Sequence, residues 1–160
     1  MPADSALRLR PITPEDDSFL AGLYASTRAE ELAITGWSDE DKALFCRRQF
    51  DAQTAHYLEN YTGTSLQIIE RAGVPAGRLY LARREREVRI MDIALLPEHR
   101  GSGIGTRLLR ELQDEARAAG KSLTIHVERF NPALRLYERL GFKQMEDKGV
   151  YLLLSWETDE

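Results

Sequence analysis

Residues 87–128 contain, in direct succession, a β-rich run, a glycine-rich segment, the pattern of an amphipathic helix and a second β-rich run. The first run is EVRIMDIALLP and the second is SLTIHVE. Five apolar residues between them recur at helical spacing: Ile104, Leu108, Leu109, Leu112 and Ala116. Gly120 follows this stripe and suits the end of a helix. Because two strands joined by a helix form a right-handed crossover, the segment predicts a central parallel strand pair.

Three further β-rich runs precede this unit along the chain. They are LRLR at 7–10, TSLQIIE at 64–70 and VPAGRLYLARR at 74–84. Short turns separate the last two from each other and from the strand that follows, which is typical of an antiparallel meander. The run GVYLLLSW adds a last strand, either in the sheet interior or at an edge. We therefore expect a mixed, mostly antiparallel twisted sheet.

Helix start signals occur between the first and second strands and again near the end of the chain. Thr13 and Ser38 are expected N-caps, and Pro14 suits a first helical position. Asn131 precedes a short helical segment in the same way. The sequence thus predicts one α/β domain over residues 1–160 in which about four helices flank the sheet.

Composition narrows the classes of protein that fit. The chain has 160 residues, 22 basic and 26 acidic, and no basic patch suited to the phosphate backbone of a nucleic acid. Its one cysteine, Cys46, excludes an internal disulfide and a CxxC metal site. No apolar run approaches the roughly 20 residues of a membrane span, and the first residues lack a signal pattern. We expect a cytoplasmic protein without nucleic-acid, membrane or metal partners.

The segment GSGIGTR lies directly before the central helix. It matches neither the dinucleotide fingerprint GxGxxG nor the P-loop, which needs a lysine. Unhindered backbone N–H groups at the positive end of a helix still form a binding site for phosphate or pyrophosphate, and Arg100 adds a charge. The alternative is that the glycines only permit a tight turn. The loop's place after a strand favours ligand binding, because ligands bind at the carboxyl ends of strands.

Three motifs in this order and spacing resemble those of the GNAT superfamily of acyl-CoA-dependent N-acyltransferases. RGSGIG, from Arg100 to Gly105, matches the family pattern of Arg or Gln, two residues, Gly, one residue, Gly or Ala. DIALLPEHR is similar to the family's central strand ending in a bulge, and NPALRLYERLGF to its second signature. With the strand and helix pattern, the resemblance covers roughly residues 7–156. It implies a GNAT-like fold, acetyl-CoA as cosubstrate, and direct acetyl transfer to a primary amine in a ternary complex.

The resemblance also implies where acetyl-CoA binds. The backbone of the glycine loop would cradle the pyrophosphate, and the exposed edge of the central strand would pair with the pantetheine arm. A backbone N–H of Leu95 or Leu96 would stabilise the oxyanion. The implied cofactor-binding residues are Leu95, Leu96, Arg100, Gly101, Ser102, Gly103, Ile104, Gly105, Thr106, Asn131 and Tyr137.

Tyr137 occupies the position at which the family commonly has a general acid for the leaving thiolate. A tyrosine with a pKa near 10 stays protonated at neutral pH, above the roughly 8.5 of a thiol, and can donate a proton. The alternative is that Tyr137 only packs its helix against the sheet.

The general base is the least defined part of the site. Arg89 stands at one frequent family position and cannot act as a base. Glu87, two residues earlier on the same face, is another position used in the family. His126 and Glu128 are the other base candidates, because they alternate onto the face of their strand opposite its apolar residues, which indicates a wet cleft. The alternative for His126 is a structural hydrogen bond. Asp92 has the opposite parity to Glu87 and is interpreted as structural.

Two other classes of function stay open at this stage. The fold could serve as a CoA-binding sensor or partner module without turnover, because no base is obvious. A nucleotide-binding module is the third possibility, although no lysine or ribose-binding acidic residue supports it. For an enzyme, the acceptor is a small-molecule amine or a peptide amino group. A homodimer is an open possibility, since members of the family are often dimers.

Overall fold

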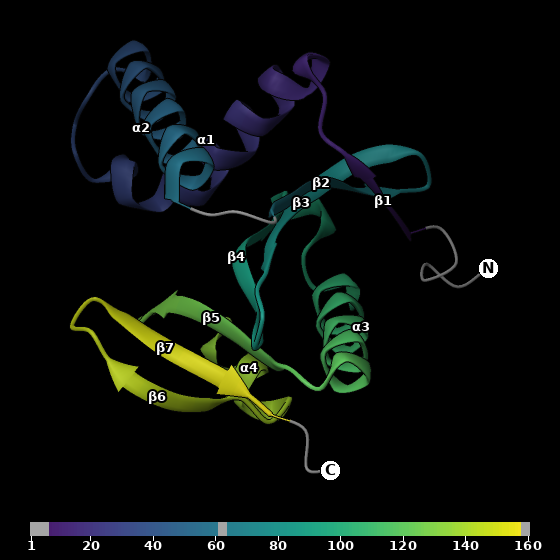
Figure 1. The fold of residues 1–160 in the computed structure, drawn as a ribbon. Helices are drawn as coiled ribbons and strands as arrows, with labels where there is room; N and C mark the ends of the chain where they lie inside the picture. The colour runs from purple at the N-terminus through teal and green to yellow at the C-terminus, as the bar shows by residue number, and fades with distance from the viewer. Residues whose placement is uncertain (1–6, 61–63, 158–160) are drawn as a thin grey trace.

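The computed structural model describes residues 7–60 and 64–157 and contains one mixed sheet in the order β1-β2-β3-β4-β5-β7-β6 (Figure 1). The strands are β1 (Leu7–Pro11), β2 (Thr64–Arg71), β3 (Val74–Arg83), β4 (Glu87–Leu95), β5 (Ser122–Glu128), β6 (Lys143–Asp147) and β7 (Tyr151–Trp156). The helices are α1 (Asp17–Ala33), α2 (Asp39–Asn60), α3 (Ile104–Ala119) and α4 (Leu134–Arg139). Only β4 and β5 pair in parallel; the other neighbouring strands are antiparallel. This confirms the predicted fold class.

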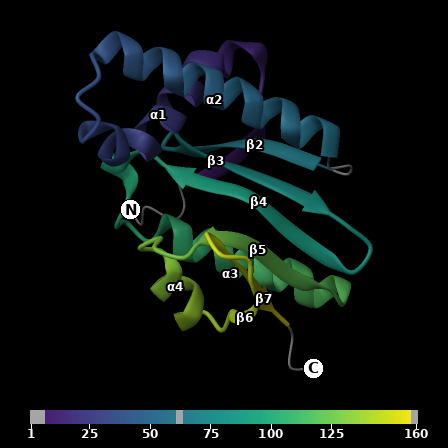
Figure 2. The same ribbon diagram turned by 90° about the vertical axis from the view of Figure 1, so that its left-hand side faces the viewer.

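The helices cover opposite faces of the sheet in pairs. Figure 2 shows α1 and α2 along one face, with α3 and α4 on the other side. Two apolar cores follow from this arrangement, because neighbouring strand residues such as Ile68 and Ile69 point to opposite faces. Ile68 packs with α1 and α2, whereas Ile69 belongs to the larger core under α3 and α4. The helical stripe predicted for α3 is buried in that larger core.

The parallel pair at the centre of the sheet is short. Its register runs only from Glu87 opposite Ser122 to Ile90 opposite Ile125. Beyond that point β4 continues beside β3 to Leu95, and β5 continues beside β7 to Glu128. The two strands therefore separate, and from Met91 onward one edge of β4 carries no strand partner among the described residues. In an α/β sheet such a gap is a place where a ligand binds.

The C-terminal strands resolve one open expectation and add an element that was not predicted. β7 lies between β5 and β6, so the apolar run near the end of the chain is an interior strand. β6 lies beyond β7 at one edge of the sheet, and all five of its residues are exposed. Its sequence KQMED shows no alternation of apolar and polar residues, which explains why the sequence did not predict it.

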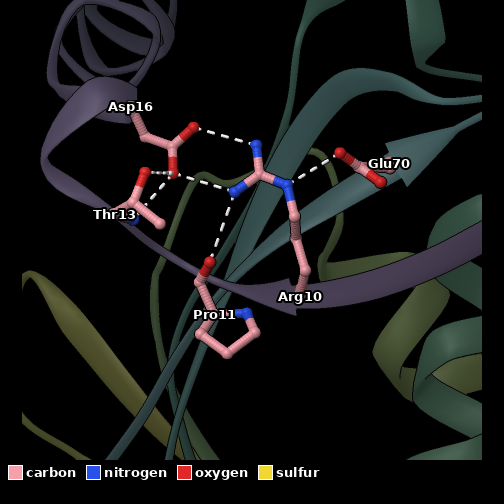
Figure 3. A network of polar contacts seen from close by, with 5 residues as sticks. All are labelled: Arg10, Pro11, Thr13, Asp16 and Glu70. Atoms are coloured by element: carbon pink, nitrogen blue, oxygen red, sulfur yellow. Dashed lines mark hydrogen bonds and ion pairs between the residues drawn. The ribbon is translucent and has the colours of Figure 1, made fainter.

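The start of α1 differs in detail from the prediction. Thr13 and Pro14 do begin the helical segment, but its first turn, Pro14–Asp16, is a 3-10 helix. The buried Asp16 carboxylate accepts hydrogen bonds from the Thr13 backbone N–H at 2.8 Å and from Arg10 at 2.9 Å through each terminal nitrogen. Arg10 Nε also donates to Glu70 at 2.7 Å (Figure 3). These bonds tie β1, β2 and the start of α1 together.

We expect Asp16→Asn to destabilise the protein by about 1.5–3 kcal/mol at pH 7, because it removes hydrogen bonds to a charged group. The hydrogen bonds from Arg10, together with those from Thr13, hold the pKa of Asp16 well below its usual value. A lowered pKa in the folded state gives stability above the unfolded pKa of about 4, and this stability is lost as the pH falls further. Urea unfolding should therefore show a smaller difference in the free energy of unfolding between Asp16→Asn and wild type at pH 3 than at pH 7. An equal difference at the two pH values would contradict the stabilising role of the ionised Asp16.

Candidate active site

A cleft of about 530 Å³ lies where β4 and β5 separate, on the face of the sheet covered by α2. It is lined by Gln53, His56, Tyr57, Met91, Asp92, His126, Val127, Glu128, Asn131, Lys148 and Tyr151. Three of the predicted site residues, His126, Glu128 and Asn131, are among them. The polar face of β5 predicted from its alternation therefore does line a cleft.

Asp92 lines the same cleft, and the parity predicted for it, opposite to that of Glu87 and Arg89, was wrong. Tyr80 pairs with Asp92 while the next residue, Leu81, pairs with Ile90, so Met91 is an extra residue in β4. Such a β-bulge reverses the alternation of side chains beyond it. Asp92 consequently lies on the same face as Arg89 rather than the opposite one. The bulge also lies four residues before Leu95, not at the end of the strand as expected.

Arg78 on β3 is the partner of Asp92 and was not singled out by the sequence. Its side chain is only 3% exposed, and its Nε donates to Asp92. Nη2 donates to Gln53 of α2 at 2.9 Å, and the guanidinium lies 4.9 Å from the centre of the Tyr80 ring. Nη1 is buried without a hydrogen-bond partner among the described residues. An arginine between the apolar residues of a buried strand is the signal that could have revealed this pair.

The glycine loop lies at the start of α3. Gly101 and Gly103 have φ angles of 73° and 86°, and a Cβ added at either would meet no atom within 4 Å. The first hydrogen bond at this end of α3 runs from Arg107 N–H to Gly103 C=O at 3.0 Å. The amides of 104–106 therefore precede the helical ladder and can bind an anion. The Ser102 hydroxyl donates to the His99 carbonyl at 2.8 Å, so it holds the loop in shape.

The edge of β4 next to this loop distinguishes between the two expected oxyanion donors. Leu96 N–H donates to the Ala76 carbonyl on β3 at 2.8 Å and is not available. By the alternation of an antiparallel pair, the Leu95 amide points the other way, toward the gap. The Leu95 carbonyl accepts a hydrogen bond from Arg100 Nε at 3.0 Å. Of the two residues, Leu95 therefore remains the candidate.

Gly77 on β3 allows this end of β4 to approach closely, which the sequence did not predict. A Cβ at Gly77 would lie 2.1 Å from the Ala94 carbonyl oxygen and 2.9 Å from the Leu95 side chain. We expect Gly77→Ala to displace β4 and to lower stability by about 1–3 kcal/mol or more, as overpacking does. Gly22→Ala is the matched control, because a Cβ at this helical glycine meets nothing within 4 Å. It should raise stability by up to about 1 kcal/mol. Unchanged urea unfolding of Gly77→Ala would contradict the close approach.

Tyr137 lies on α4 and is 5% exposed in the larger core. Its ring makes an edge contact with Phe142 at 5.5 Å between centres. Burial, and to a lesser extent the negative charge of Asp92, raise the pKa of Tyr137 to about 12. The packing role considered from the sequence is therefore present, and the hydroxyl stays protonated throughout the neutral range.

Asn131 begins the turn that leads into α4. Its side-chain oxygen accepts a hydrogen bond from Ala133 N–H at 2.8 Å. The helix itself begins at Leu134, so an intervening turn separates Asn131 from the helix start predicted for it. Asn131 thus stabilises the turn and lines the cleft at the same time.

The base candidates differ in their surroundings. Glu87 accepts hydrogen bonds from Arg89 Nη2 at 3.0 Å and from the Thr124 hydroxyl. Burial raises the pKa of Glu87, but the Thr124 hydrogen bond and the nearby arginines outweigh it and lower the pKa. Glu87 is also roughly 25 Å along β4 from Leu95, too far for contact with a group bound there. Glu128 is exposed at the end of β5, within the cleft.

Residues 7–60 and 64–157 contain no group of three or more histidine, cysteine, aspartate or glutamate side chains placed to hold a metal ion. In the same part of the chain, no helix is long and apolar enough to cross a membrane.

Comparison with known proteins agrees with this geometry. The sequence profile of the Acetyltransferase (GNAT) family matches residues 23–142. Streptothricin acetyltransferase from Streptomyces lavendulae is 46% identical over 55 residues, which are 33% of this chain and 29% of that protein. The [ribosomal protein bS18]-alanine N-acetyltransferase of Haemophilus influenzae is 33% identical over 66 residues, which are 41% of this chain and 45% of that protein. The chain thus matches less than half the length of either relative.

Solved structures share the fold over almost the whole chain. PaiA N-acetyltransferase from Thermoplasma acidophilum, in complex with coenzyme A, superposes with a TM-score of 0.71 at 18% identity, covering 95% of this chain and 99% of that one. Arabidopsis thaliana Naa50 with a bisubstrate analogue gives 0.61 at 16% identity, covering 96% and 99%. The chain is an α/β protein whose central parallel pair separates, with a cleft on the α2 face of the sheet and a glycine loop at the start of α3. The chain belongs to the GNAT acetyltransferase family.

Proposed function

We propose that this protein is an acetyl-CoA-dependent N-acetyltransferase that moves the acetyl group directly to a primary amine in a ternary complex. The observation that carries the proposal is the separation of β4 from β5. It exposes the Leu95 edge beside the glycine loop and opens a polar cleft on the face covered by α2. Cosubstrate and acceptor can therefore meet within the sheet from different sides.

The residues around the gap fit the parts of acetyl-CoA. The amides from Gly101 to Thr106 would hold the pyrophosphate at the positive end of α3, with the charge of Arg100 beside them. The Leu95 edge would pair with the pantetheine arm, after Arg100 leaves the Leu95 carbonyl. Leu96 and Asn131 would contribute contacts on either side. When bound, acetyl-CoA supplies the acetyl group as a reactive thioester.

The chain's own groups then divide the work of the transfer. The Leu95 N–H would stabilise the negative charge on the thioester oxygen. As the C–N bond forms and the C–S bond breaks, the Tyr137 hydroxyl would donate to the departing sulfur. Asp92 and Glu128 line the cleft and would attract the ammonium form of the acceptor, and Glu128, which is exposed there, would accept its proton. A base helps because an amine with a pKa of about 10.4 is neutral in only about one of 2,500 molecules at pH 7.

The acceptor belongs to one of two chemical groups, as the relatives illustrate. One relative is named as a streptothricin acetyltransferase and another as an N-acetyltransferase of an alanine of a ribosomal protein. A small-molecule amine and a peptide amino group are the candidates for this chain.

A CoA-binding sensor without turnover is the second candidate function. The observation in its favour is that Arg89 replaces a frequent base position and that Glu87 is held in ion pairs with Arg89 and Arg84. Such a sensor would bind acetyl-CoA through the same loop and edge but would transfer nothing.

One experiment separates these functions. The purified protein is incubated with isotope-labelled acetyl-CoA and a mixed pool of amines, metabolites and peptides, and labelled products are identified by mass spectrometry. A labelled amide would establish the transferase and name its acceptor class. Binding of acetyl-CoA by calorimetry without any labelled product would favour the sensor, and absence of binding would contradict both.

A further inference from the structure

His126 and Arg89 contact each other at the point where the parallel pair ends. They lie on the neighbouring strands β5 and β4, on the face covered by α2. Arg89 Nη1 lies 3.3 Å from His126 Nδ1. Met91 and Asp92 continue β4 from this point along the wall of the cleft, and His126 lines the cleft from the other side.

The Arg89 guanidinium is held firmly in this position. Its Nε donates to the Thr124 hydroxyl at 2.6 Å, and its Nη2 donates to Glu87 at 3.0 Å. Its side chain is only 11% exposed. Two partners, Thr124 on β5 and Glu87 on β4, therefore fix the direction of the N–H group that faces His126.

This contact determines which nitrogen of His126 carries the proton. A guanidinium stays protonated in proteins and has only donors, so Nδ1 of His126 must act as the acceptor. A neutral imidazole has one N–H, which then resides on Nε2. Nε2 is buried and has no hydrogen-bond partner among the described residues.

Burial and the neighbouring positive charges keep the ring neutral. Burial and the positive charges of Arg89 and Lys148 lower the pKa of His126, against the weaker opposing effect of Glu146 and Glu87. The other titratable side chains that line the cleft are His56 and Tyr57 of α2, Asp92 of β4, Glu128 of β5, Lys148 and Tyr151. At neutral pH the Nε2–H group therefore persists.

We propose that His126 is a fixed hydrogen-bond donor, not a base, and that its Nε2–H recognises an oxygen atom of the acceptor substrate. The inference rests on the proposed function and makes it more specific. His126 lies on the α2 face of the sheet, opposite α3 and its glycine loop, so it would contact the acceptor rather than the pyrophosphate of the cosubstrate. It favours amines that carry a carbonyl, carboxylate or hydroxyl oxygen close to the nitrogen. An acceptor without that oxygen leaves a buried donor unpaired, which is unfavourable.

The first test reads the protonation of His126 directly and needs no activity. The chain has three histidines, so a two-dimensional nitrogen–proton spectrum of the labelled protein can be assigned with His56→Gln and His99→Gln. At pH 7 we expect Nε2 of His126 to have the chemical shift of a protonated nitrogen and Nδ1 to have that of an unprotonated nitrogen. In Arg89→Met, the Nε2 and Nδ1 shifts of His126 should move toward the averaged values of a ring that exchanges between its two neutral tautomers. A protonated Nδ1 in wild type overturns the proposal, even if the variant fails to fold.

The second test measures acceptor choice. Alaninamide and its isostere, in which an isopropyl group replaces the carboxamide, differ in the oxygen that His126 would recognise. We expect His126→Ala to lower the preference for alaninamide by about 5- to 150-fold in kcat/KM, with acetyl-CoA affinity unchanged. His126→Gln, whose amide offers an N–H at the same distance from the backbone, should keep most of the preference. An unchanged preference in His126→Ala, or a loss of turnover in His126→Gln as large as for a missing base, would refute the donor role.

The two tests separate the inference from the proposed function. If wild type acetylates neither amine, the proposed function loses support for this acceptor class. The nitrogen spectrum still decides whether Arg89 holds His126 as an Nε2–H donor.

Discussion

Tyr137→Phe should reduce turnover by about 100- to 1,000-fold while leaving acetyl-CoA affinity unchanged. The range is that of one lost hydrogen-bond donor to a charge that develops in the transition state. Phenylalanine fills the same space in the core and keeps the edge contact with Phe142, so the fold should persist. Steady-state kinetics with the acceptor found by isotope labelling, together with calorimetry of acetyl-CoA, measures both quantities.

Tyr24→Phe provides the control for this change. Tyr24 is also buried, and its hydroxyl accepts a hydrogen bond from Arg28 at 2.8 Å; neither residue lines the cleft. Tyr24→Phe should lower the stability of the protein and change its turnover little. Equal turnover of Tyr137→Phe and wild type would leave Tyr137 with its packing role alone.

The pKa of Tyr137 adds a dependence on pH to this prediction. Burial raises it to about 12, so the hydroxyl does not titrate in the neutral range. The loss caused by Tyr137→Phe should therefore be the same at pH 7 and pH 9. The same high pKa makes complete proton transfer to a thiolate unfavourable, so Tyr137 acts mainly as a hydrogen-bond donor to the sulfur.

Gly103→Val should weaken acetyl-CoA binding by about 10- to 150-fold, the equivalent of one lost hydrogen bond to a charged group. Gly103 has a φ angle of 86°, in the left-handed region that a β-branched residue avoids. Either the loop changes conformation and misplaces the amides at the start of α3, or the new side chain occupies the space in front of them. Calorimetry with acetyl-CoA detects both effects.

The opposite end of the same helix offers a matched control. Gly120 has a φ angle of 67°, and a Cβ there also meets no atom within 4 Å. Gly120→Val thus imposes a similar backbone strain at the other end of α3. It should lower stability by a comparable amount, about 1–3 kcal/mol, and leave the affinity for acetyl-CoA intact. If both variants bind equally well, the loop is only a turn.

The elements with strong periodicity were predictable from the sequence. The apolar stripe of α3 and the alternation of β5 defined the parallel crossover, and the alternation also placed His126 and Glu128 in a cleft. The glycine loop was recognisable because glycine readily adopts the left-handed backbone conformation, which Gly101 and Gly103 have. In these cases each residue's position depends only on local geometry.

The parts that could not be predicted depend on contacts between distant segments. The bulge at Met91 reverses the side-chain parity of β4, and no local pattern marks it. For that reason Asp92 was placed on the wrong face and its pairing with Arg78 was missed. Gly77 matters only because Ala94 of another strand lies against it. β6 is held by its pairing with β7 rather than by its own composition.

The sheet consists of two blocks, β1 to β4 and β5 to β7, joined through β4 and β5 by a register of only four residue pairs. A ligand whose extended arm pairs with the Leu95 edge would act as an additional strand in the gap between the two blocks. The same hydrogen bonds would then bind the ligand and stabilise the sheet. At a concentration 100 times its dissociation constant, such a ligand adds about 2.7 kcal/mol to the stability of the folded chain. Each release of product would return the sheet to its divided form.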